Sequence, residues 1–108
     1  MAKKNNRTLT QPMFYLLLSL KEKRHGYEIM QYVEKLTQGR VKIGPGTLYS
    51  LLSRFEEEEY IQMISEEENK KTYLITSLGN QMLEEEIKRL EFLLEDAQKV
   101  LGGGEDEL

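Results

Sequence analysis

The stretch that decides the fold is Gly44 to Phe55, which reads GPGTLYSLLSRF. Its proline and glycines suit the entry into a helix, because the backbone N–H groups of a first turn have no helical acceptor. Four apolar residues follow at positions i, i+3, i+4 and i+7, which is the spacing of one buried helical face: Leu48, Leu51, Leu52 and Phe55. The stretch therefore predicts a loop that leads directly into a short amphipathic helix over residues 46–58.

The opposite side of this helix carries small or hydrogen-bonding side chains and no acidic residue before Glu56. These side chains are Thr47, Ser50, Ser53 and Arg54, with Tyr49 on the flank. A helix that enters a DNA groove needs such a side, since donors and small side chains reach base edges and phosphates. Its N-terminal N–H groups also suit a phosphate. An ordinary amphipathic helix has the same pattern, so the stretch alone leaves both interpretations open.

The composition of the chain excludes several classes of protein. Its 108 residues suffice for one domain with an appended helix, and the absence of cysteine excludes disulfides and thiolate metal sites. The longest apolar run, Met13–Leu20, is too short to cross a bilayer, and no signal peptide is recognisable. The only histidine, His25, has no partner that would suggest catalysis, and no phosphate loop or metal-ligand spacing is present. We expect a cytoplasmic protein that is not an enzyme and holds no cofactor or metal.

Charge is distributed unevenly along the chain, although the net charge is only −4. Residues 1–54 contain ten basic and three acidic residues, a formal charge of +7, whereas residues 55–108 contain five and sixteen, a formal charge of −11. A uniformly acidic protein would argue against a nucleic-acid partner. Here the helix with the polar side lies in the basic half, which favours DNA as the partner.

Two more helices are predicted before the decisive stretch. The first begins near Thr10, a good N-cap, and tolerates Pro12 in its first turn. The second opens at His25 and is stopped by Gly39. The expected buried faces are Met13, Leu16, Leu17 and Leu20 in the first helix and Ile29, Tyr32, Val33 and Leu36 in the second.

A β-hairpin and a long helix are predicted after the decisive stretch. Two β-rich runs, residues 61–65 and 71–75, flank a polar tip, which is the pattern of a two-stranded hairpin. Thr76 can cap a final helix in which apolar residues recur at spacings of four and three. The residues of this heptad seam are Leu83, Ile87, Leu90, Leu94, Ala97 and Leu101. Because the seam extends beyond the core that so small a domain can offer, we expect it to form a homodimer.

The order helix, helix, loop, helix and β-hairpin is that of a winged helix-turn-helix. We therefore expect a mainly α fold with a small β-hairpin, in which the hairpin is the wing. The expected divisions are a flexible basic arm (1–8), the winged helix-turn-helix (9–76), a C-terminal dimerisation helix (77–101) and a disordered acidic tail (102–108).

Three motifs resemble those of the PadR-like bacterial transcriptional regulators: HGYEI at 25–29, GTLY at 46–49 with Leu52, and KTYLIT at 71–76 with Gly79. The likeness extends from about residue 9 to residue 101 and is closest to the short subgroup with one C-terminal helix. It implies a homodimeric repressor that a small molecule releases from DNA. It also implies that Gly46, Thr47 and Tyr49 head the recognition helix. The family usually has glycine where this chain has Glu59, and a left-handed backbone there would strain Glu59 by roughly 1 kcal/mol.

The candidate DNA contacts follow from the expected fold. Donors on the recognition helix should face the major groove, and lysines and arginines on the arm and the wing should lie near phosphates. The candidates are Lys4, Arg7, Lys42, Gly46, Thr47, Tyr49, Ser50, Arg54, Lys70 and Lys71. Tyr49 has a competing structural role, because an aromatic residue on the flank of the helix can pack against the wing instead.

Two further hypotheses concern the final helix. An effector pocket between the first helix and two copies of the last would be lined by Phe14, Leu18, Ile87, Leu90 and Leu94. A fully packed dimer core is an equal alternative. Since the chain has no tryptophan, a small hydrophobic or phenolic effector fits better than a stacked drug. The second hypothesis is a winged-helix module that docks onto another protein through its last helix, as the acidic half suggests.

Overall fold

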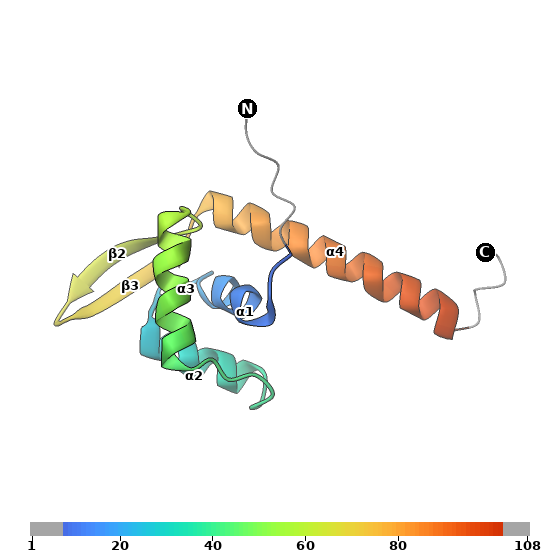
Figure 1. The fold of residues 1–108 in the computed structure, drawn as a ribbon, viewed down its shortest axis with the longest axis horizontal. Coiled ribbons are helices and arrows are strands. Elements are labelled where there is room, and N and C mark those ends of the chain that lie inside the picture. Colours follow the sequence, from blue (N-terminus) through green and yellow to red (C-terminus); the bar gives the residue numbers. More distant parts are fainter. Residues whose placement is uncertain (1–7, 103–108) are drawn as a thin grey trace.

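The structure is a computed structural model that describes residues 8–102. Seven elements follow one another along the chain: α1 (Gln11–Ser19), β1 (Arg24–His25), α2 (Gly26–Leu36), α3 (Pro45–Glu57), β2 (Ile61–Glu67), β3 (Lys70–Ile75) and α4 (Ser77–Leu101) (Figure 1). The expected mainly helical class with a long C-terminal helix is confirmed. Lys4 and Arg7, and most of the predicted acidic tail, lie outside the described residues.

The predicted helix starts agree with the capping contacts. The backbone N–H of Met13 donates to Thr10 Oγ1 (3.4 Å), and the backbone N–H of Gly79 donates to Thr76 Oγ1 (3.0 Å). Each hydroxyl satisfies an N–H group that has no acceptor within its own helix. Helix α3 begins at Pro45, one residue earlier than predicted.

The sheet has three antiparallel strands in the order β1-β3-β2, whereas a two-stranded hairpin was expected. The additional strand, β1, pairs Arg24 with Tyr73 and His25 with Thr72. Two residues are too few to show the alternation by which a strand is recognised in a sequence. The guanidinium of Arg24 also lies over the Tyr32 ring, 3.8 Å from its centroid, which joins the strand to α2.

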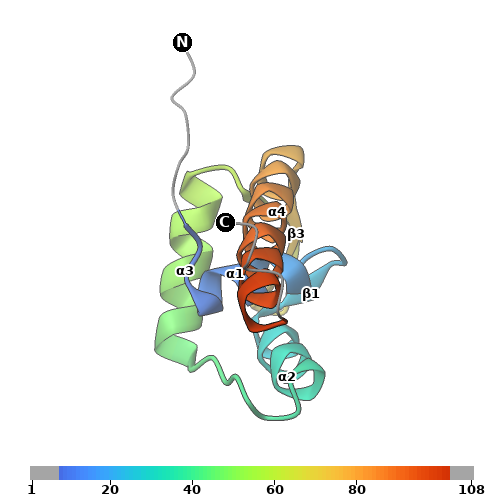
Figure 2. The ribbon, with the colours of Figure 1, turned by 90° about the vertical axis from the view of Figure 1, so that its right-hand side faces the viewer.

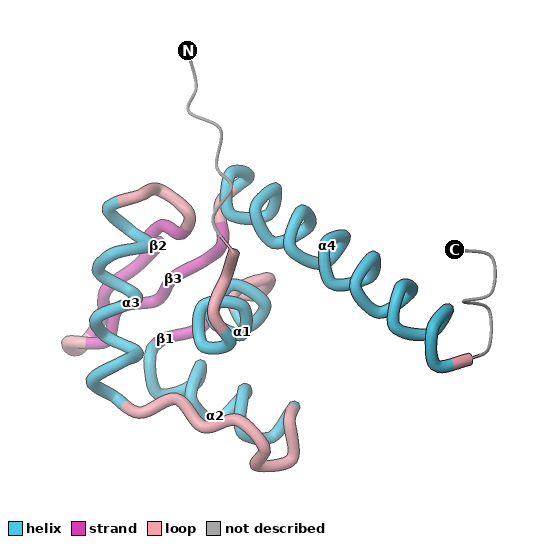
Figure 3. The backbone as a smooth tube through the Cα atoms, turned by 45° about the vertical axis from the view of Figure 1, so that its right-hand side comes forward, coloured by secondary structure: helices cyan, strands magenta, loops and turns pink. Residues whose placement is uncertain are grey.

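One continuous core joins the helices and the sheet. Helix α1 lies at the centre of this core and contacts α2, α3 and α4 (Figure 2). The sheet lies against the C-terminal end of α1, where the N–H of Ile75 donates to the carbonyl of Leu20 (Figure 3). The apolar faces predicted for α1 and α3 are buried: Met13, Leu16, Leu17 and Leu20 in α1, and Leu48, Leu51, Leu52 and Phe55 in α3.

The prediction for the end of α2 was wrong, because Leu36 is 47% exposed. Thr37, which is 1% exposed, takes the inward position instead. Its hydroxyl donates to the carbonyl of Val33 (2.8 Å) and accepts from the N–H of Val41 (3.1 Å), so the burial of this polar group is compensated. Gly39 follows with a φ of +82° and donates its N–H to the carbonyl of Glu34 (2.8 Å), which closes the end of the helix.

Helix α4 is held by the core only over its first half. Leu83 is 3% exposed and Ile87 packs at the edge of the core, whereas every residue from 88 to 102 is exposed. The second half therefore projects away from the domain (Figure 1). Among the described residues, no helix is long and apolar enough to cross a membrane.

A buried carboxylate lies where α4 leaves the core. Glu86 is 5% exposed and accepts two hydrogen bonds from Arg89, at 3.1 Å from Nε and 2.6 Å from Nη2. The backbone N–H of Leu9 is a third, longer donor, at 3.5 Å. The hydrogen bonds from Arg89 are the main reason why the pKa of Glu86 is lowered, and burial opposes them. The contact fixes the segment that enters α1 to the middle of α4.

Candidate nucleic-acid interface

The outward face of α3 carries the side chains that the sequence predicted. Thr47, Ser50 and Ser53 are exposed, whereas the apolar face of the helix is buried. Gly44 is the N-cap residue in an extended conformation, and within the described residues no side chain caps the first turn. The N-terminal N–H groups of α3 are therefore open to a ligand, and this helix end carries partial positive charge. An acceptor such as a phosphate oxygen suits this end of the helix.

Tyr49 packs against the start of α2, whereas the wing was the structural partner expected for it. A Cβ atom added to Gly26 would lie only 2.6 Å from Tyr49 Oη and 2.9 Å from its Cζ. The tyrosine ring therefore rests on the backbone of Gly26 and depends on the missing side chain there. Tyr49 is nevertheless 55% exposed, so the same ring also faces solvent. Gly26 of the HGYEI motif and Tyr49 of the GTLY motif, which are 23 residues apart in the sequence, meet at this contact.

The wing ends in a two-residue turn. Glu68 and Asn69 have φ values of +52° and +67°, which is the conformation of a type I′ hairpin turn. Lys70 and Lys71 follow at the start of β3, and both are exposed. Each lies opposite a glutamate of β2, in the pairs Glu67↔Lys70 and Glu66↔Lys71. Three glutamates at 66–68 and two lysines at 70–71 give the tip a formal charge of −1, so the wing is less basic than its lysines alone suggest.

Two other candidate contacts already have partners on the surface. Lys42 Nζ lies 3.7 Å from Glu34 Oε2, and Arg54 Nε lies 3.6 Å from Glu58 Oε2. Pairs of this kind between exposed groups are worth about 1 kcal/mol or less. Either cation can therefore turn from its glutamate to a phosphate at small cost.

Glu59 occupies the left-handed position at which the family usually has glycine, with a φ of +68°. The N–H of Tyr60 donates to the carbonyl of Phe55 (2.9 Å), and the N–H of Glu59 donates to the carbonyl of Glu56 (3.0 Å). These two bonds form the Schellman arrangement that often ends a helix, in which glycine is the preferred residue. Thr76 Oγ1 donates to the carbonyl of Glu59 (2.7 Å). The turn into the wing is thus kept, and the expected strain of roughly 1 kcal/mol falls on Glu59.

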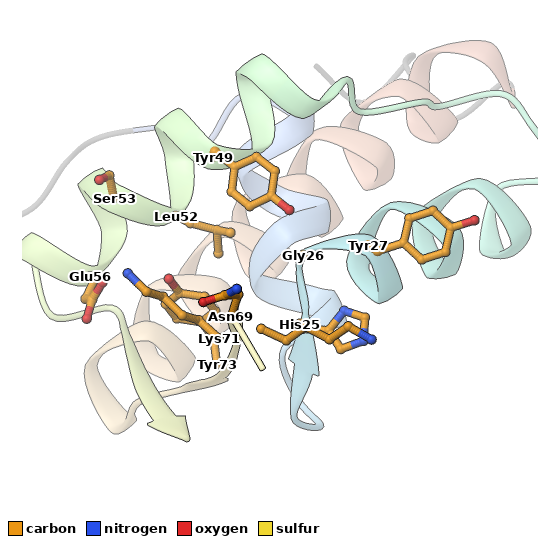
Figure 4. A pocket seen from close by; sticks show the side chains of 11 residues that line it. His25, Gly26, Tyr27, Tyr49, Leu52, Ser53, Glu56, Asn69, Lys71 and Tyr73 are labelled. Atoms are coloured by element: carbon orange, nitrogen blue, oxygen red, sulfur yellow. The ribbon is translucent and has the colours of Figure 1, made fainter. Parts of the chain in front are cut away.

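A groove of about 620 Å³ separates α3 from the wing (Figure 4). It brings Tyr49 of α3 together with Lys70 and Lys71 of the wing, as the expected fold requires. Ser53, on the polar side of α3, also lines the groove. The remaining lining residues were not predicted to contact DNA: His25, Gly26, Tyr27, Leu52, Glu56, Asn69 and Tyr73. Several of these residues belong to the HGYEI and KTYLIT motifs, and membership of a motif is the feature of the sequence that could have identified them as functional.

His25 lies at the start of α2, as predicted. Its backbone N–H donates to Glu28 Oε1 (3.0 Å), and its Nε2 lies 3.6 Å from the same oxygen. Within residues 8–102, no group of three or more histidine, aspartate or glutamate side chains is arranged to hold a metal ion.

Comparison with known proteins decides the family. The model of the "Transcriptional regulator PadR-like family" matches residues 16–85, which include the three motifs, α3 and the wing. The chain belongs to this family. It is therefore a DNA-binding transcriptional regulator with a PadR-like winged helix. The matched range ends before the projecting half of α4.

Two individual relatives are similar to this chain. The chain is 38% identical over 71 residues to the transcriptional regulator YqjI of Escherichia coli, covering 66% of this chain but 34% of that protein. It thus spans about a third of the length of that relative. It is also 38% identical over 77 residues to an uncharacterised protein of Lysinibacillus sphaericus, covering 68% of this chain and 71% of the other.

Solved PadR-like structures have the same fold. A transcriptional regulator from Clostridium thermocellum superimposes with a TM-score of 0.68 at 29% identity, covering 80% of this chain and 84% of the other. A PadR-like regulator from Bacillus cereus superimposes with a TM-score of 0.64 at 25% identity, covering 81% and 86%. The fold expected from the motifs is thereby confirmed for this PadR-like chain.

Proposed function

We propose that this PadR-like protein is a homodimeric repressor that acts in the cytoplasm on an inverted-repeat operator. The observation that carries the proposal is the face of α3, where exposed donors lie next to a helix N-terminus without a side-chain cap. In this arrangement Thr47, Tyr49 and Ser50 face the major groove, and the N–H groups near Gly46 face a phosphate. Arg54 and Lys42 leave their ion pairs with Glu58 and Glu34 and bind DNA phosphates instead. Lys4 and Arg7, on the N-terminal arm, lie along the DNA backbone.

The dimer is proposed to form through the projecting half of α4. Leu90 and Leu94 are 40% and 58% exposed on one side of a helix that the domain does not cover. A pair of such faces buries this apolar surface when two helices associate. Leu83 and Ile87 serve the core of their own chain, so the dimer seam is reduced to Leu90, Leu94, Ala97 and Leu101.

The proposed divisions of the chain follow from this arrangement: an arm (1–8), a DNA-binding domain (9–76), a dimerisation helix (77–101) and a tail (102–108). A two-fold dimer reads two half-sites about one helical turn of DNA apart.

Release by a small hydrophobic or phenolic effector is a finer part of the proposal. Phe14 and Leu18 are half-buried at the edge of the core beside Ile87, and Leu90 and Leu94 follow on α4. A second copy of α4 would complete an apolar site over these residues. An effector must bind the DNA-incompetent arrangement more tightly, because equal affinity for both arrangements shifts nothing.

A second function, docking onto another protein through α4, is favoured by one observation. The wing tip carries a formal charge of −1, from three glutamates and two lysines, where a phosphate clamp would be basic. The two functions differ in their response to salt. Protein binding releases condensed counterions from DNA, and this release becomes less favourable as the salt concentration rises, so DNA binding weakens steeply.

Recovery and sequencing of the DNA fragments that the purified protein retains tests the main proposal. The recovered operator should be bound with an affinity that falls as salt rises. Replacing Thr47 and Ser50 with alanine should reduce discrimination by about 1–3 kcal/mol per lost base contact. Gln81→Ala, on the exposed side of α4 near the core, is the matched control. Retention of random DNA, or none, would contradict the proposal.

The wing is tested separately. Replacing Lys70 and Lys71 with alanine should flatten the dependence of log affinity on log salt by about two units. An unchanged slope would exclude the wing as a phosphate clamp while leaving α3 as the reading element.

A further inference from the structure

The groove between α3 and the wing has an interior unlike a phosphate site. Its floor is formed by the buried side chains of Leu52 and Tyr73, and Tyr49 forms one wall where its ring extends toward Gly26 (Figure 4). The volume of about 620 Å³ exceeds what a bound water or a single phosphate needs. Tyr27 points away from the other labelled side chains and contributes only to the rim. Apolar and polar side chains therefore both line the groove.

Charges of both signs line this groove. Lys70 and Lys71 come from the wing, and neither forms an ion pair with another of the described residues. Glu56 contributes a carboxylate from α3 to the same groove. The phosphates of a DNA backbone would be attracted by the two lysines and repelled by the Glu56 carboxylate. Duplex DNA is therefore expected at the rim of the groove and not in its interior. A small molecule with an anionic group and a separate hydrogen-bond donor can satisfy the lysines and Glu56 together.

The floor adds a hydrogen-bonding group that stays neutral. Burial raises the pKa of Tyr73, and the carboxylates of Glu56 and Glu66 raise it further. The hydroxyl therefore remains protonated at neutral pH and can both donate and accept a hydrogen bond. Tyr49, which is 55% exposed, offers contact area to a planar ring, because aromatic rings favour stacking.

We propose that this groove binds a small planar aromatic anion that also carries a hydrogen-bond donor, and that its occupancy excludes DNA from α3 and the wing. The second clause rests on the proposed function, since it requires Tyr49, Lys70 and Lys71 to contact DNA. The anion lies beside the two lysines, the ring lies on Tyr49, and the donor faces Glu56. Two sources supply this chemistry, a nucleoside monophosphate and an aromatic carboxylate with an amino group.

NMR titration of the ¹⁵N-labelled full-length protein tests binding without DNA. The probes are adenosine 5′-monophosphate, 4-aminobenzoate and benzoate, which has the ring and the acid but no donor. Either of the first two should shift the amide signals of Gly26, Asn69 and Tyr73. Lys71→Ala should weaken that binding about fivefold, or roughly 1 kcal/mol. Lys99→Ala, an exposed lysine on the projecting half of α4, should leave it unchanged.

The role of Glu56 gives a second, independent measurement. Glu56→Ala should weaken the binding of the probes that carry an amino group, because it removes a hydrogen-bond acceptor. It should strengthen the binding of benzoate, because it removes a negative charge that repels the carboxylate. A merely structural role of Glu56 would move both affinities in the same direction. Failure of both donor-carrying probes to shift the groove signals, or equal binding by wild type and Lys71→Ala, would overturn the assignment. Binding of only one of the two supports the assignment and identifies the source.

Competition with the recovered operator completes the test. The bound probe should displace the DNA, whereas an operator that stays bound with the groove filled would overturn the exclusion. Groove binding in a protein that retains no DNA would contradict the proposed function and leave the ligand site intact. The two failures are therefore distinguishable.

Discussion

Gly79→Ala should destabilise this protein, although alanine in place of a helical glycine ordinarily stabilises a helix by about 1 kcal/mol. Gly79 lies in the first turn of α4, against the segment where the recognition helix passes into the wing. A Cβ atom there would lie 2.1 Å from the carbonyl oxygen of Tyr60 and 2.8 Å from Ile75 Cγ1. The nearer atom belongs to the backbone and cannot swing away as a side chain could.

The size of the expected loss of stability follows from the shift that the added Cβ atom requires. The carbonyl of Tyr60 accepts a hydrogen bond from the N–H of Thr76 (3.0 Å), the residue that caps α4. Separating Cβ from this oxygen needs a shift of about 1 Å in one of the two segments, and such overpacking costs about 1–3 kcal/mol. Weakening of the Tyr60–Thr76 bond adds about 1 kcal/mol. After the helical gain of about 1 kcal/mol is subtracted, the net loss is about 1–3 kcal/mol.

Urea unfolding followed by circular dichroism, at one fixed protein concentration, measures this loss. Gly46→Ala is the matched control, since a Cβ atom at Gly46 meets no atom within 4 Å. That variant should be unchanged or up to about 1 kcal/mol more stable. A Gly79→Ala protein as stable as wild type would refute the argument from the Tyr60 carbonyl.

Three other predictions concern assembly, the tyrosine contact and a buried carboxylate. Replacing Leu90 and Leu94 with glutamate should convert the proposed dimer to monomer in light scattering, because it places like charges on the apolar face at a cost of several kcal/mol. A variant that stays dimeric at micromolar concentration would contradict the proposed seam. Gly26→Ala should push the Tyr49 ring aside with little loss of stability but about a fivefold loss of operator affinity, and a second change, Tyr49→Leu, should add no further loss if the first acts through the ring. Folding lowers the pKa of Glu86, so the contribution of this carboxylate to stability is present above the ordinary value of 4.5 and is lost as the pH falls through the lowered value. The difference in unfolding free energy between wild type and Glu86→Gln should therefore vanish in acid. A difference that does not depend on pH would contradict this prediction.

The elements that could be predicted are those whose signal is local. Thr10 and Thr76 lie before apolar periodicities, and capping needs only a hydroxyl three residues before the N–H it accepts. The short strand β1 could not be predicted, because its two residues are defined by their pairing with β3, more than 40 residues later. Leu36 was misplaced for a similar reason. Periodicity puts it on the buried face, and only the loop from Thr37 to Val41 decides that a threonine fills this place.

The candidate site divides in the same way. The polar face of α3 follows from helical spacing alone, and its exposure agrees with the sequence. The contact between Gly26 and Tyr49, and the groove that joins Glu56 to the wing, depend on how separate elements pack. The heptad spacing gave no means of separating Leu83, which serves the domain core, from Leu90, which is exposed, because both occupy the same side of one helix.

Helix α4 is also a lever arm. It is clamped in the domain as far as Glu86, and the remaining 15 residues to Leu101 span about 22 Å at 1.5 Å per residue. A change of about 10° in the angle at which the helix leaves the core would move its far end by roughly 4 Å, by the same geometry. The hydrogen bonds of Glu86 to Arg89 and to the Leu9 N–H lie at the fulcrum. Small repacking beneath this point is therefore magnified into a large displacement of whatever the far end holds.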